Sequence, residues 1–341
     1  MKEKKMTVKS RLLELLEQHK GETLSGERLA EELACTRAAV WKAVKSLREE
    51  GYTIEAGPNK GYMLARDSNR LSVEGMRLYL NNPQVSVKIY EQLNSTNQEA
   101  KKVAVSGEAS HGSFVVALVQ TAGRGRKGRS FYSPKDTGLY LSVVLEPEET
   151  LKESLLITTA AATAVYKAVQ KVCGVSLDIK WVNDLYRNGK KVCGILTEAV
   201  TDFESGDIEF AIVGIGLNLY VEQEELPQEL SGVAGGIFDT RQEAEGTDRN
   251  RLAAEIVNAL LEETKELRLS REYVEHNMVP GRKIEISDGG NTRMARALSI
   301  CEDGRLLVEE EDGTQNRLFY GEVSLRVRDL QVINKIEKNH R

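Results

Sequence analysis

A glycine- and arginine-rich segment between two strand patterns constrains this chain more than any other part of its sequence. It runs Gln120-Thr-Ala-Gly-Arg-Gly-Arg-Lys-Gly-Arg129, after the apolar run 113–120 and before the run 138–145. Between residues 120 and 135 there are five cations, Arg124, Arg126, Lys127, Arg129 and Lys135, and no acidic residue. Glycine lets the backbone approach a ligand closely, and arginine binds phosphate or carboxylate oxygens through forked hydrogen bonds. The pattern predicts a loop for a polyanion such as a nucleotide phosphate. A mobile basic surface loop is the less favoured alternative.

The context of this segment excludes the common nucleotide-binding motifs. Gly123, Gly125 and Gly128 satisfy G-x-G-x-x-G, but a dinucleotide fold needs a helix directly after the glycines. Here the sequence continues with Ser130-Phe-Tyr-Ser-Pro134 and a strand pattern. No G-x-x-x-x-G-K-[ST] occurs, and the H-R-D and D-F-G motifs of protein kinases are absent. The segment therefore belongs to another kind of fold, with strands on both sides.

Three amphipathic helix patterns followed by a hairpin pattern open the chain. Residues 7–18 carry leucines on one helical face, Ser25 can cap a short second helix, and Thr36 can cap a third over 37–50. Two short strand patterns then flank a turn at 57–61. This order predicts a winged helix-turn-helix.

The third helix carries the predicted DNA-binding residues. Its outward positions hold Arg37, Trp41, Lys42 and Lys45, followed by Arg48. The alternative is a basic helix face that is merely solvated, and Trp41 can also pack on a neighbouring domain. We favour DNA binding because the caps, the helix order and the wing all agree.

Composition limits what the rest of the chain can be. Residues 1–66 hold 13 Lys and Arg against 10 Asp and Glu, whereas the whole chain has a net charge of −5, so any nucleic-acid contact is expected at this head. The four cysteines form no C-x-x-C pair, which argues against zinc ribbons and disulfide scaffolds. No apolar run approaches the roughly 18 residues of a membrane span, and no signal-peptide core follows the basic N-terminus. We therefore expect a cytoplasmic protein without a membrane partner.

The remaining sequence predicts an α+β architecture. Strand patterns cover 85–92, 113–120, 138–145, 177–181, 192–200 and 208–217, with helices at about 96–106, 151–173 and 248–268. Short connections between neighbouring strands favour a mixed, largely antiparallel sheet. Residues 279–328 show short strands separated by Asp-Gly turns, which is typical of a small β-barrel. The predicted domains are 1–66 (winged helix-turn-helix), 67–84 (linker), 85–278 (catalytic) and 279–330 (barrel).

Two further clusters are suggestive. Lys180-Trp-Val-Asn-Asp-Leu-Tyr186 places polar side chains near a strand end, with Lys190 and Lys191 across a turn at Asn188-Gly189. By itself the N-G-K sequence is better explained as a type I′ hairpin. The segment Gly214-Ile-Gly-Leu-Asn218 ends a strand with a polar residue after small ones, which alone is a weak signal.

Taken together, these motifs resemble the biotin–protein ligase family in its bifunctional ligase and biotin-operon-repressor form. The matching segments are Ser95-Thr-Asn97, Gln120 to Arg129, Lys180-Trp-Val-Asn-Asp184, Lys191-Val-Cys-Gly-Ile-Leu196 and Gly214 to Asn218. The resemblance covers nearly the whole chain. It implies a winged helix-turn-helix, a catalytic α+β domain like the class II synthetases, and a C-terminal SH3-like barrel.

The resemblance also implies a reaction and its partners. Biotin and Mg-ATP would give biotinyl-5′-AMP and pyrophosphate, and the biotinyl group would pass to a lysine of a biotin carboxyl carrier protein. The adenylate would promote a homodimer that binds biotin operator DNA. The alternatives are a lipoyl-type ligase, a DNA-binding sensor without turnover, and a ligase whose head has lost operator binding.

Residue roles follow from the same resemblance. The implied catalytic residues are Arg126, Lys191 and Asp184. The implied biotin-binding residues are Ser95, Thr96, Asn97, Gln120, Arg124, Gly125, Arg126 and Lys191. The implied ATP-binding residues are Arg129, Phe131, Asn183, Asp184 and Asn218, and no metal ligand is assigned. Two positions depart from the family pattern, since Val182 stands where proline is usual and Phe131 where tryptophan is usual.

Overall fold

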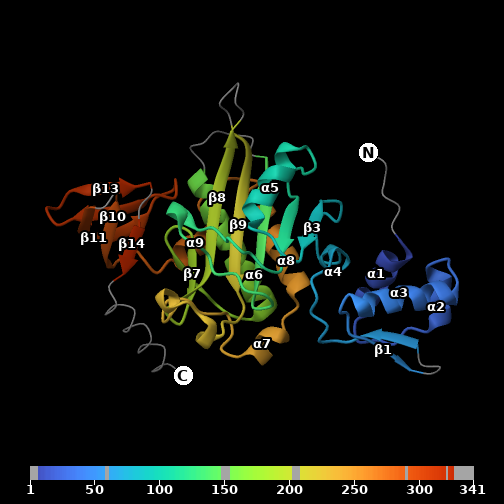
Figure 1. Ribbon diagram of the computed structural model, residues 1–341. Helices are drawn as coiled ribbons and strands as arrows, with labels where there is room; N and C mark the ends of the chain where they lie inside the picture. Colours follow the sequence, from blue (N-terminus) through green and yellow to red (C-terminus); the bar gives the residue numbers. More distant parts are fainter. Residues whose placement is uncertain are drawn as a thin grey trace. The chain divides into compact units, whose positions relative to one another are not determined.

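The chain folds into two compact units that each combine separate stretches of sequence. The computed structural model describes residues 7–57, 61–146, 154–201, 208–288, 291–319 and 322–325 (Figure 1). The first unit comprises Met1–Pro83 with Glu245–Glu255, and the second comprises Gln84–Ala244 with Ile256–Arg341. Parts of three predicted elements lie outside the described residues. They are the tip of the predicted wing at 58–60, the first turn of the helix predicted over 151–173, and residues 326–330 of the predicted barrel.

The first unit contains the predicted winged helix-turn-helix. Its elements are α1 (Val8–Gln18), α2 (Gly26–Glu32), α3 (Arg37–Glu49), β1 (Ile54–Gly57) and β2 (Gly61–Leu64). The side chains of Thr7, Ser25 and Thr36 cap the three helices by accepting hydrogen bonds from backbone N–H groups in their first turns. The core unites leucines from all three helices with Tyr52, Ile54 and Leu64 of the hairpin region.

The segment predicted as a linker has structure of its own. It contains the short helix α4 (Val73–Arg77), which Ser72 caps through Gly75 N–H. Within the first unit this segment lies against the beginning of α8 (Arg249–Glu263), a helix whose remaining turns belong to the second unit. The predicted end of this helix at about 268 was too late, since α8 ends at Glu263.

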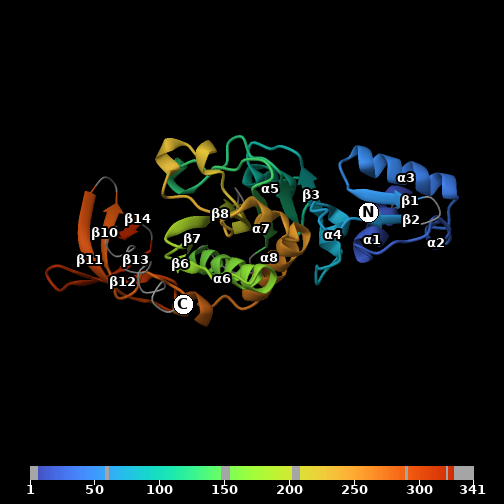
Figure 2. The same cartoon turned by 90° about the horizontal axis from the view of Figure 1, so that it is seen from below.

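A seven-stranded mixed sheet forms the body of the second unit. Its strands are β3 (Val87–Tyr90), β4 (Phe114–Ala117), β5 (Gly138–Leu145), β6 (Asp178–Lys180), β7 (Asp184–Arg187), β8 (Lys190–Thr201) and β9 (Ile208–Asn218), in the order β3-β4-β5-β9-β8-β7-β6. All neighbours are antiparallel except β3 and β4, which are parallel because α5 (Thr96–Val105) crosses between them. Figure 2 shows α5 on one face of this sheet and α6 (Ser154–Cys173) on the other.

The second unit also holds the C-terminal strands. They are β10 (Lys283–Asp288), β11 (Asn291–Ile300), β12 (Leu306–Glu310), β13 (Gln315–Leu318) and β14 (Glu322–Leu325), in the order β13-β12-β11-β10-β14. Each pair is antiparallel. Two short helices, α7 (Arg241–Glu245) and α9 (Arg271–Glu275), had no counterpart in the sequence prediction.

One carboxyl group is buried in the first unit. The pKa of Glu17, at the end of α1, is raised to about 7, chiefly by burial; Asp248 and Glu74 act in the same direction, whereas Lys20 and a hydrogen bond with Ser72 oppose the rise. Because the pKa is higher in the folded than in the unfolded chain, the folded state holds this proton more tightly. The stabilisation from that proton is present at acidic pH and is lost as pH rises toward and through 7.

We predict that Glu17→Gln removes this pH dependence. Relative to the wild type, the variant should gain roughly 2 kcal/mol in free energy of unfolding between pH 5 and pH 8, since a neutral amide has no charge to desolvate. Urea unfolding at the two pH values measures the difference. Glu31→Gln on the exposed face of α2 is the matched control, and an equal pH response in both variants would contradict the role of burial.

Candidate active site

A polar pocket opens on the α5 face of the central sheet. Its lining residues are Ser95, Thr96, Asn97, Gln120, Arg124, Phe131, Gly194, Leu196, Gly214, Ile215 and Gly216. Five predicted biotin-binding residues are thus brought together from the start of α5 and the segment after β4. Phe131, predicted on the nucleotide side, lines this same pocket.

Hydrogen bonds fix the polar side chains of the pocket. Gln120 Oε1 accepts from the backbone N–H of Thr96 at 2.9 Å and from its hydroxyl at 3.1 Å. Gln120 Nε2 donates to Ser133 Oγ at 3.0 Å. Both ends of the Gln120 amide are therefore oriented, and the start of α5 is tied to the glycine–arginine segment.

Two residues that sequence analysis missed complete this arrangement. Ser142 of β5 is fully buried, and its hydroxyl donates to Asn97 Oδ1 at 2.6 Å and lies 2.7 Å from Thr96 Oγ1. Asn97 Nδ2 donates to Glu198 Oε2 of β8 at 2.6 Å. The only signal in the sequence was a polar residue inside an apolar strand, Ser142 in GLYLSVVL and Glu198 in GILTEAV.

Glycines on β8 and β9 make room for these side chains. A Cβ atom on Gly214 would lie 2.1 Å from Asn97 Oδ1, and one on Gly216 would lie 2.4 Å from the ring of Phe131. A Cβ atom on Gly194 would lie 3.1 Å from the Phe131 ring and 3.2 Å from Lys191 Nζ. The weak Gly214–Asn218 signal therefore has a steric reason, because side chains there would fill the pocket.

The glycine–arginine segment folds into a closed turn. Gly125 N–H donates to Arg129 O at 2.7 Å, and Lys127 and Gly128 take left-handed backbone angles, with φ of 55° and 75°. Arg126 Nη1 leaves this turn and donates to Asn183 Oδ1 at 3.1 Å. The arginine turn thus reaches the Lys180–Asp184 motif, as the family pattern implies.

An ion pair lies beside the pocket. Lys191 Nζ and Asp184 Oδ1 are 2.6 Å apart, with side chains that are 30% and 20% exposed. Asn183, adjacent to Asp184, is held by reciprocal hydrogen bonds to the backbone of Ile195 on β8. Gly194 stands between Lys191 and Phe131, so the ion pair and the pocket share one wall.

Asn218 and Arg129 lie away from this pocket. Asn218 lines a separate depression with Tyr132, Pro134, Thr137, Val221, Glu222 and Glu225, and its Nδ2 donates to Gly235 O at 3.4 Å. The segment Val233–Gly235 pairs with Lys191 at the start of β8. Val233 O accepts from Lys191 N–H, and Gly235 N–H donates to Lys191 O. Arg129 is exposed on the arginine turn.

The Val182 position is held by neighbouring aromatic groups. The Trp181–Val182 peptide bond is cis, Tyr273 donates its hydroxyl to Val182 O, and Trp181 Nε1 donates to Gly304 O. Cys193, also in this region, is fully buried, and burial raises the pKa of its thiol. A thiol in that state is a packing group rather than a nucleophile.

The predicted DNA-binding residues all lie on the outside of α3. Arg37, Trp41, Lys42 and Lys45 are exposed, Trp41 by 56%, and Lys45 Nζ lies 5.9 Å from the centre of the Trp41 ring. Arg48 is exposed as well, as predicted, and its guanidinium donates to Ile54 O, which joins α3 to the wing.

Comparison with known proteins matches both the N-terminal helix-turn-helix region and the region of the central sheet to known families. Residues 89–218 match the Biotin/lipoate A/B protein ligase family, and residues 8–63 match a helix-turn-helix (HTH) domain family. The Bifunctional ligase/repressor BirA of Bacillus subtilis is 32% identical, with 94% of this chain and 99% of that protein covered. The corresponding protein of Escherichia coli is 31% identical, with 94% and 98% covered. The chain belongs to the bifunctional ligase/repressor family.

A solved structure of the biotin protein ligase branch supports the fold. The Biotin protein ligase of Aquifex aeolicus in complex with biotin and ATP matches with a TM-score of 0.56 and 26% identity, over 71% of this chain and 98% of that one.

Within the described part of the chain, no three His, Cys, Asp or Glu side chains are grouped to hold a metal. A search of the same residues found no helix with the length and apolarity needed to cross a membrane.

We predict that Gly214→Ala displaces Asn97 and so disrupts the polar pocket. The added methyl group cannot coexist with Asn97 at 2.1 Å, so the asparagine must leave its buried hydrogen bonds. The free energy of unfolding should fall by about 1–3 kcal/mol, as for other overpacked sites. Urea unfolding measures this loss.

Gly26→Ala is the control, since its Cβ atom would lie 3.6 Å from the nearest atom, on Tyr62, at the start of α2. That change should be neutral or stabilising. A Gly214→Ala protein as stable as the wild type would show that Asn97 is not fixed by its glycine neighbour.

Proposed function

We propose that this protein joins biotin to a carrier protein in two steps. A carboxylate oxygen of biotin attacks the α-phosphorus of ATP, the bond to the β-phosphate oxygen breaks, and pyrophosphate leaves with biotinyl-5′-AMP formed. The amine of a carrier lysine then attacks the acyl carbon, AMP leaves, and the ammonium proton goes to solvent. Membership of the bifunctional ligase/repressor family supports this, and the Lys191–Asp184 pair beside the polar pocket is the observation that carries it.

The polar pocket suits the ureido ring of biotin. That ring presents one carbonyl oxygen and two N–H groups, and it carries no charge. Thr96, Asn97 and Gln120 offer hydroxyl and amide groups. Their orientation is set by hydrogen bonds with Ser142, Glu198 and Ser133. Oriented neutral donors and acceptors select a neutral polar ring over a charged one. Ser95 and the backbone at Arg124 and Gly125 complete the proposed ureido contacts.

Cations solve the electrostatic problem of the first step. The first step brings the biotin carboxylate close to the ATP α-phosphate, and both groups are negatively charged. Two like unit charges at about 4 Å repel by roughly 4 kcal/mol at an effective dielectric constant of 20. Arg126 and Lys191 are proposed to neutralise the carboxylate and the α-phosphate, with Arg129 at the departing pyrophosphate. Asp184 holds the Lys191 ammonium group, and in the second step we propose that it orients the carrier lysine.

The nucleotide side is proposed around Asn218, Phe131 and Asn183. Asn218 would meet the adenine, and Phe131 would cover it after a change of side-chain position from its place in the polar pocket. Mg²⁺ is commonly held by one or two carboxylates together with substrate phosphates, and Asp184 with Asn183 fits that need. The ion would neutralise phosphate charge.

We predict that Lys191→Ala and Arg126→Ala each lower the rate of adenylate formation by about 10²–10³-fold, because each removes a cation aimed at developing charge. Biotin-dependent exchange of labelled pyrophosphate into ATP measures this step. Lys171→Ala, on the exposed end of α6, is the control for simple loss of charge. Exchange at the wild-type rate in the two site variants would refute these assignments.

Lipoyl ligation and sensing without turnover are the competing functions. The matched family model covers both biotin and lipoate ligases, while the full-length relatives are named for a ligase and repressor. Transfer of radiolabelled biotin to a carrier domain, with lipoate as competitor, separates the three. Transfer that lipoate does not inhibit supports biotin, whereas binding without transfer supports a sensor.

We propose that the same protein is a biotin-responsive repressor. Arg37, Trp41, Lys42 and Lys45 would contact operator DNA, and a homodimer would place two heads on half-sites an integral number of helical turns apart. Beyond Ile195, β8 pairs only with β9 among the described strands, and we propose that a second copy joins the sheet at this edge.

Three smaller assignments belong to the same proposal. The five-stranded C-terminal sheet would be the SH3-like domain, and the central sheet the synthetase-like domain. The predicted divisions 1–66, 67–84, 85–278 and 279–330 would be the functional segments. The protein would act in the cytoplasm, where ATP and operator DNA are present.

We predict that operator binding requires both biotin and ATP. In gel shifts with a biotin-operon promoter fragment, affinity should fall steeply between 50 and 200 mM salt, as is typical of phosphate contacts. Replacing Lys42 and Lys45 together by Ala should weaken binding and flatten the salt dependence. Binding indifferent to biotin and ATP would contradict the co-repressor role.

A further inference from the structure

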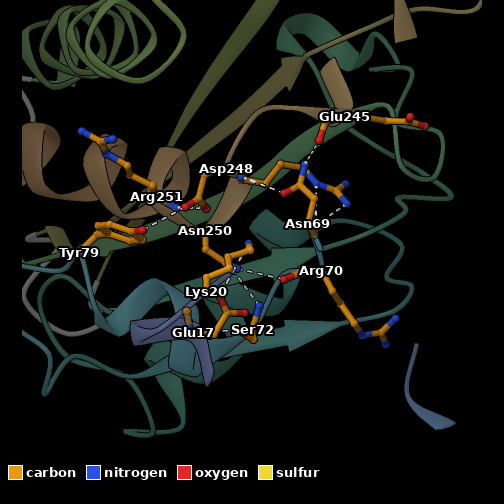
Figure 3. A network of polar contacts seen from close by, with 12 residues as sticks. Glu17, Lys20, Asn69, Arg70, Ser72, Tyr79, Glu245, Asp248, Asn250 and Arg251 are labelled. Carbon is orange, nitrogen blue, oxygen red and sulfur yellow. Dashed lines mark hydrogen bonds and ion pairs between the residues drawn. The ribbon is translucent and has the colours of Figure 1, made fainter. Parts of the chain in front are cut away.

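The segment after the winged head is fastened to the first turn of α8, although about 180 residues separate them in sequence. Figure 3 shows the polar contacts that join residues 69–72 to the region from Glu245 to Arg251. All of these residues belong to the first unit. We call residues 69–72 the clamped segment.

Asn250 forms the centre of this network. Its side chain is only 2% exposed, its Oδ1 accepts from Ser72 N–H at 2.9 Å, and its Nδ2 donates to Arg70 O at 3.0 Å. The two bonds bracket Leu71, which is itself buried. A side-chain carboxamide carries donors and an acceptor side by side, so Asn250 satisfies buried backbone groups on both sides of one residue.

Further contacts fasten the start of the clamped segment and the chain just beyond it. Asn69 Oδ1 accepts from Arg249 N–H at 3.1 Å, and Arg249 Nη2 donates to Asn69 O at 2.8 Å. Tyr79 donates its hydroxyl to Asp248 Oδ2 at 3.1 Å, while Asp248 Oδ1 caps α8 through Arg251 N–H. Asn69 is therefore fixed to Arg249, and Tyr79, beyond the clamped segment, is fixed to Asp248.

The winged head holds the other side of the clamped segment. Ser72 hydrogen-bonds with Glu17 of α1, and the Arg70 guanidinium lies 5.7 Å from the centre of the Tyr52 ring. Leu64, in the core of the head, precedes Asn69 by a few residues only. The clamped segment is thus a layer between the head and the first turn of α8.

Gly75 shows how closely these parts fit. A Cβ atom on Gly75 would lie 2.6 Å from Asn250 Nδ2 and 2.8 Å from Ser72 Oγ. A side chain there would expel Asn250 or break the cap of α4. The sequence therefore keeps a glycine inside a helix, where it lowers helix stability, to make room for the Asn250 amide.

We propose that Asn250 is a positioning residue for operator binding, which locks the winged head to the first turn of α8. A free flexible tether of the predicted 67–84 length would have an r.m.s. span of roughly 20–25 Å, and the head would sample many orientations. The two heads of a dimer must reach two half-sites at one fixed spacing. Once the first head is bound, a second head that samples many orientations faces its half-site only part of the time. Its effective concentration at that half-site is therefore lower. The functional part of this inference rests on the proposed repressor role.

The lock can be opened from either side. Asn250→Ala removes both hydrogen bonds, and Gly75→Ala displaces the asparagine from the segment side. Glu262→Ala, at an exposed position of α8, is the matched control. Trypsin cleavage after Arg70 reports opening directly, because the Arg70 carbonyl oxygen accepts from Asn250 in the locked state.

With the full-length protein and no DNA, cleavage after Arg70, identified by intact mass, should be about 10- to 100-fold faster in Asn250→Ala and in Gly75→Ala than in the wild type. The control should match the wild type. In gel shifts with biotin and ATP, both variants should bind the promoter fragment at least tenfold more weakly. Transfer of biotin to the carrier domain should stay within about twofold of the wild type, which also shows that the variants are folded.

Three results would overturn the proposal. Unchanged cleavage in both variants would show that Asn250 does not close the segment. Faster cleavage with unchanged operator affinity would show that the lock does not position the head. A wild-type protein that is resistant at Arg70 yet binds no operator would refute the repressor role on which the functional part rests, while leaving the lock itself established by the cleavage rates.

Discussion

The row of hydrogen bonds that fastens α5 to the central sheet, buried at its centre and half-buried at its two ends, is the interaction on which the site depends. It runs from Glu198 on β8 through Asn97 to Ser142 on β5, and on through Thr96 to Gln120. A buried polar network stabilises one arrangement only when every member has its partner, since an orphaned group costs about 1–3 kcal/mol. Here the network joins two strands, a helix start and the loop after β4. The polar side chains of the network are therefore held in place before any ligand enters the pocket.

The glycine–arginine turn depends on the same fixed frame. Its cations would have little directional effect if they hung from a mobile surface loop. Ser133 ties the turn to Gln120, Arg126 ties it to Asn183, and left-handed angles at Lys127 and Gly128 close its end. Charges held by such ties need no reorganisation when a negative charge approaches. The density of Gly and Arg in the sequence was informative because both the turn and its partners require them.

Residues whose role is visible in a short local motif could be predicted from the sequence. Residues whose role depends on a partner far away in the sequence could not. The caps Ser25 and Thr36, the arginine turn and the polar ends of β7 and β8 were all visible as short motifs. Ser142 and Glu198 were not, because a lone polar residue in a strand has meaning only once the strand order β5-β9-β8 places both beneath α5. Phe131 was predicted for the nucleotide side from the family pattern, and its ring packs over Gly216 in the polar pocket.

The predicted linker illustrates the same limit on a larger scale. Residues 67–84 were predicted as a linker, and nothing nearby in sequence shows that Asn250 will bracket Leu71. The helix that supplies Asn250 continues into Ile256, Val257 and Leu260, which are fully buried in the second unit. One unbroken helix thus carries the fastening of the head at its start and core residues of the catalytic unit further along.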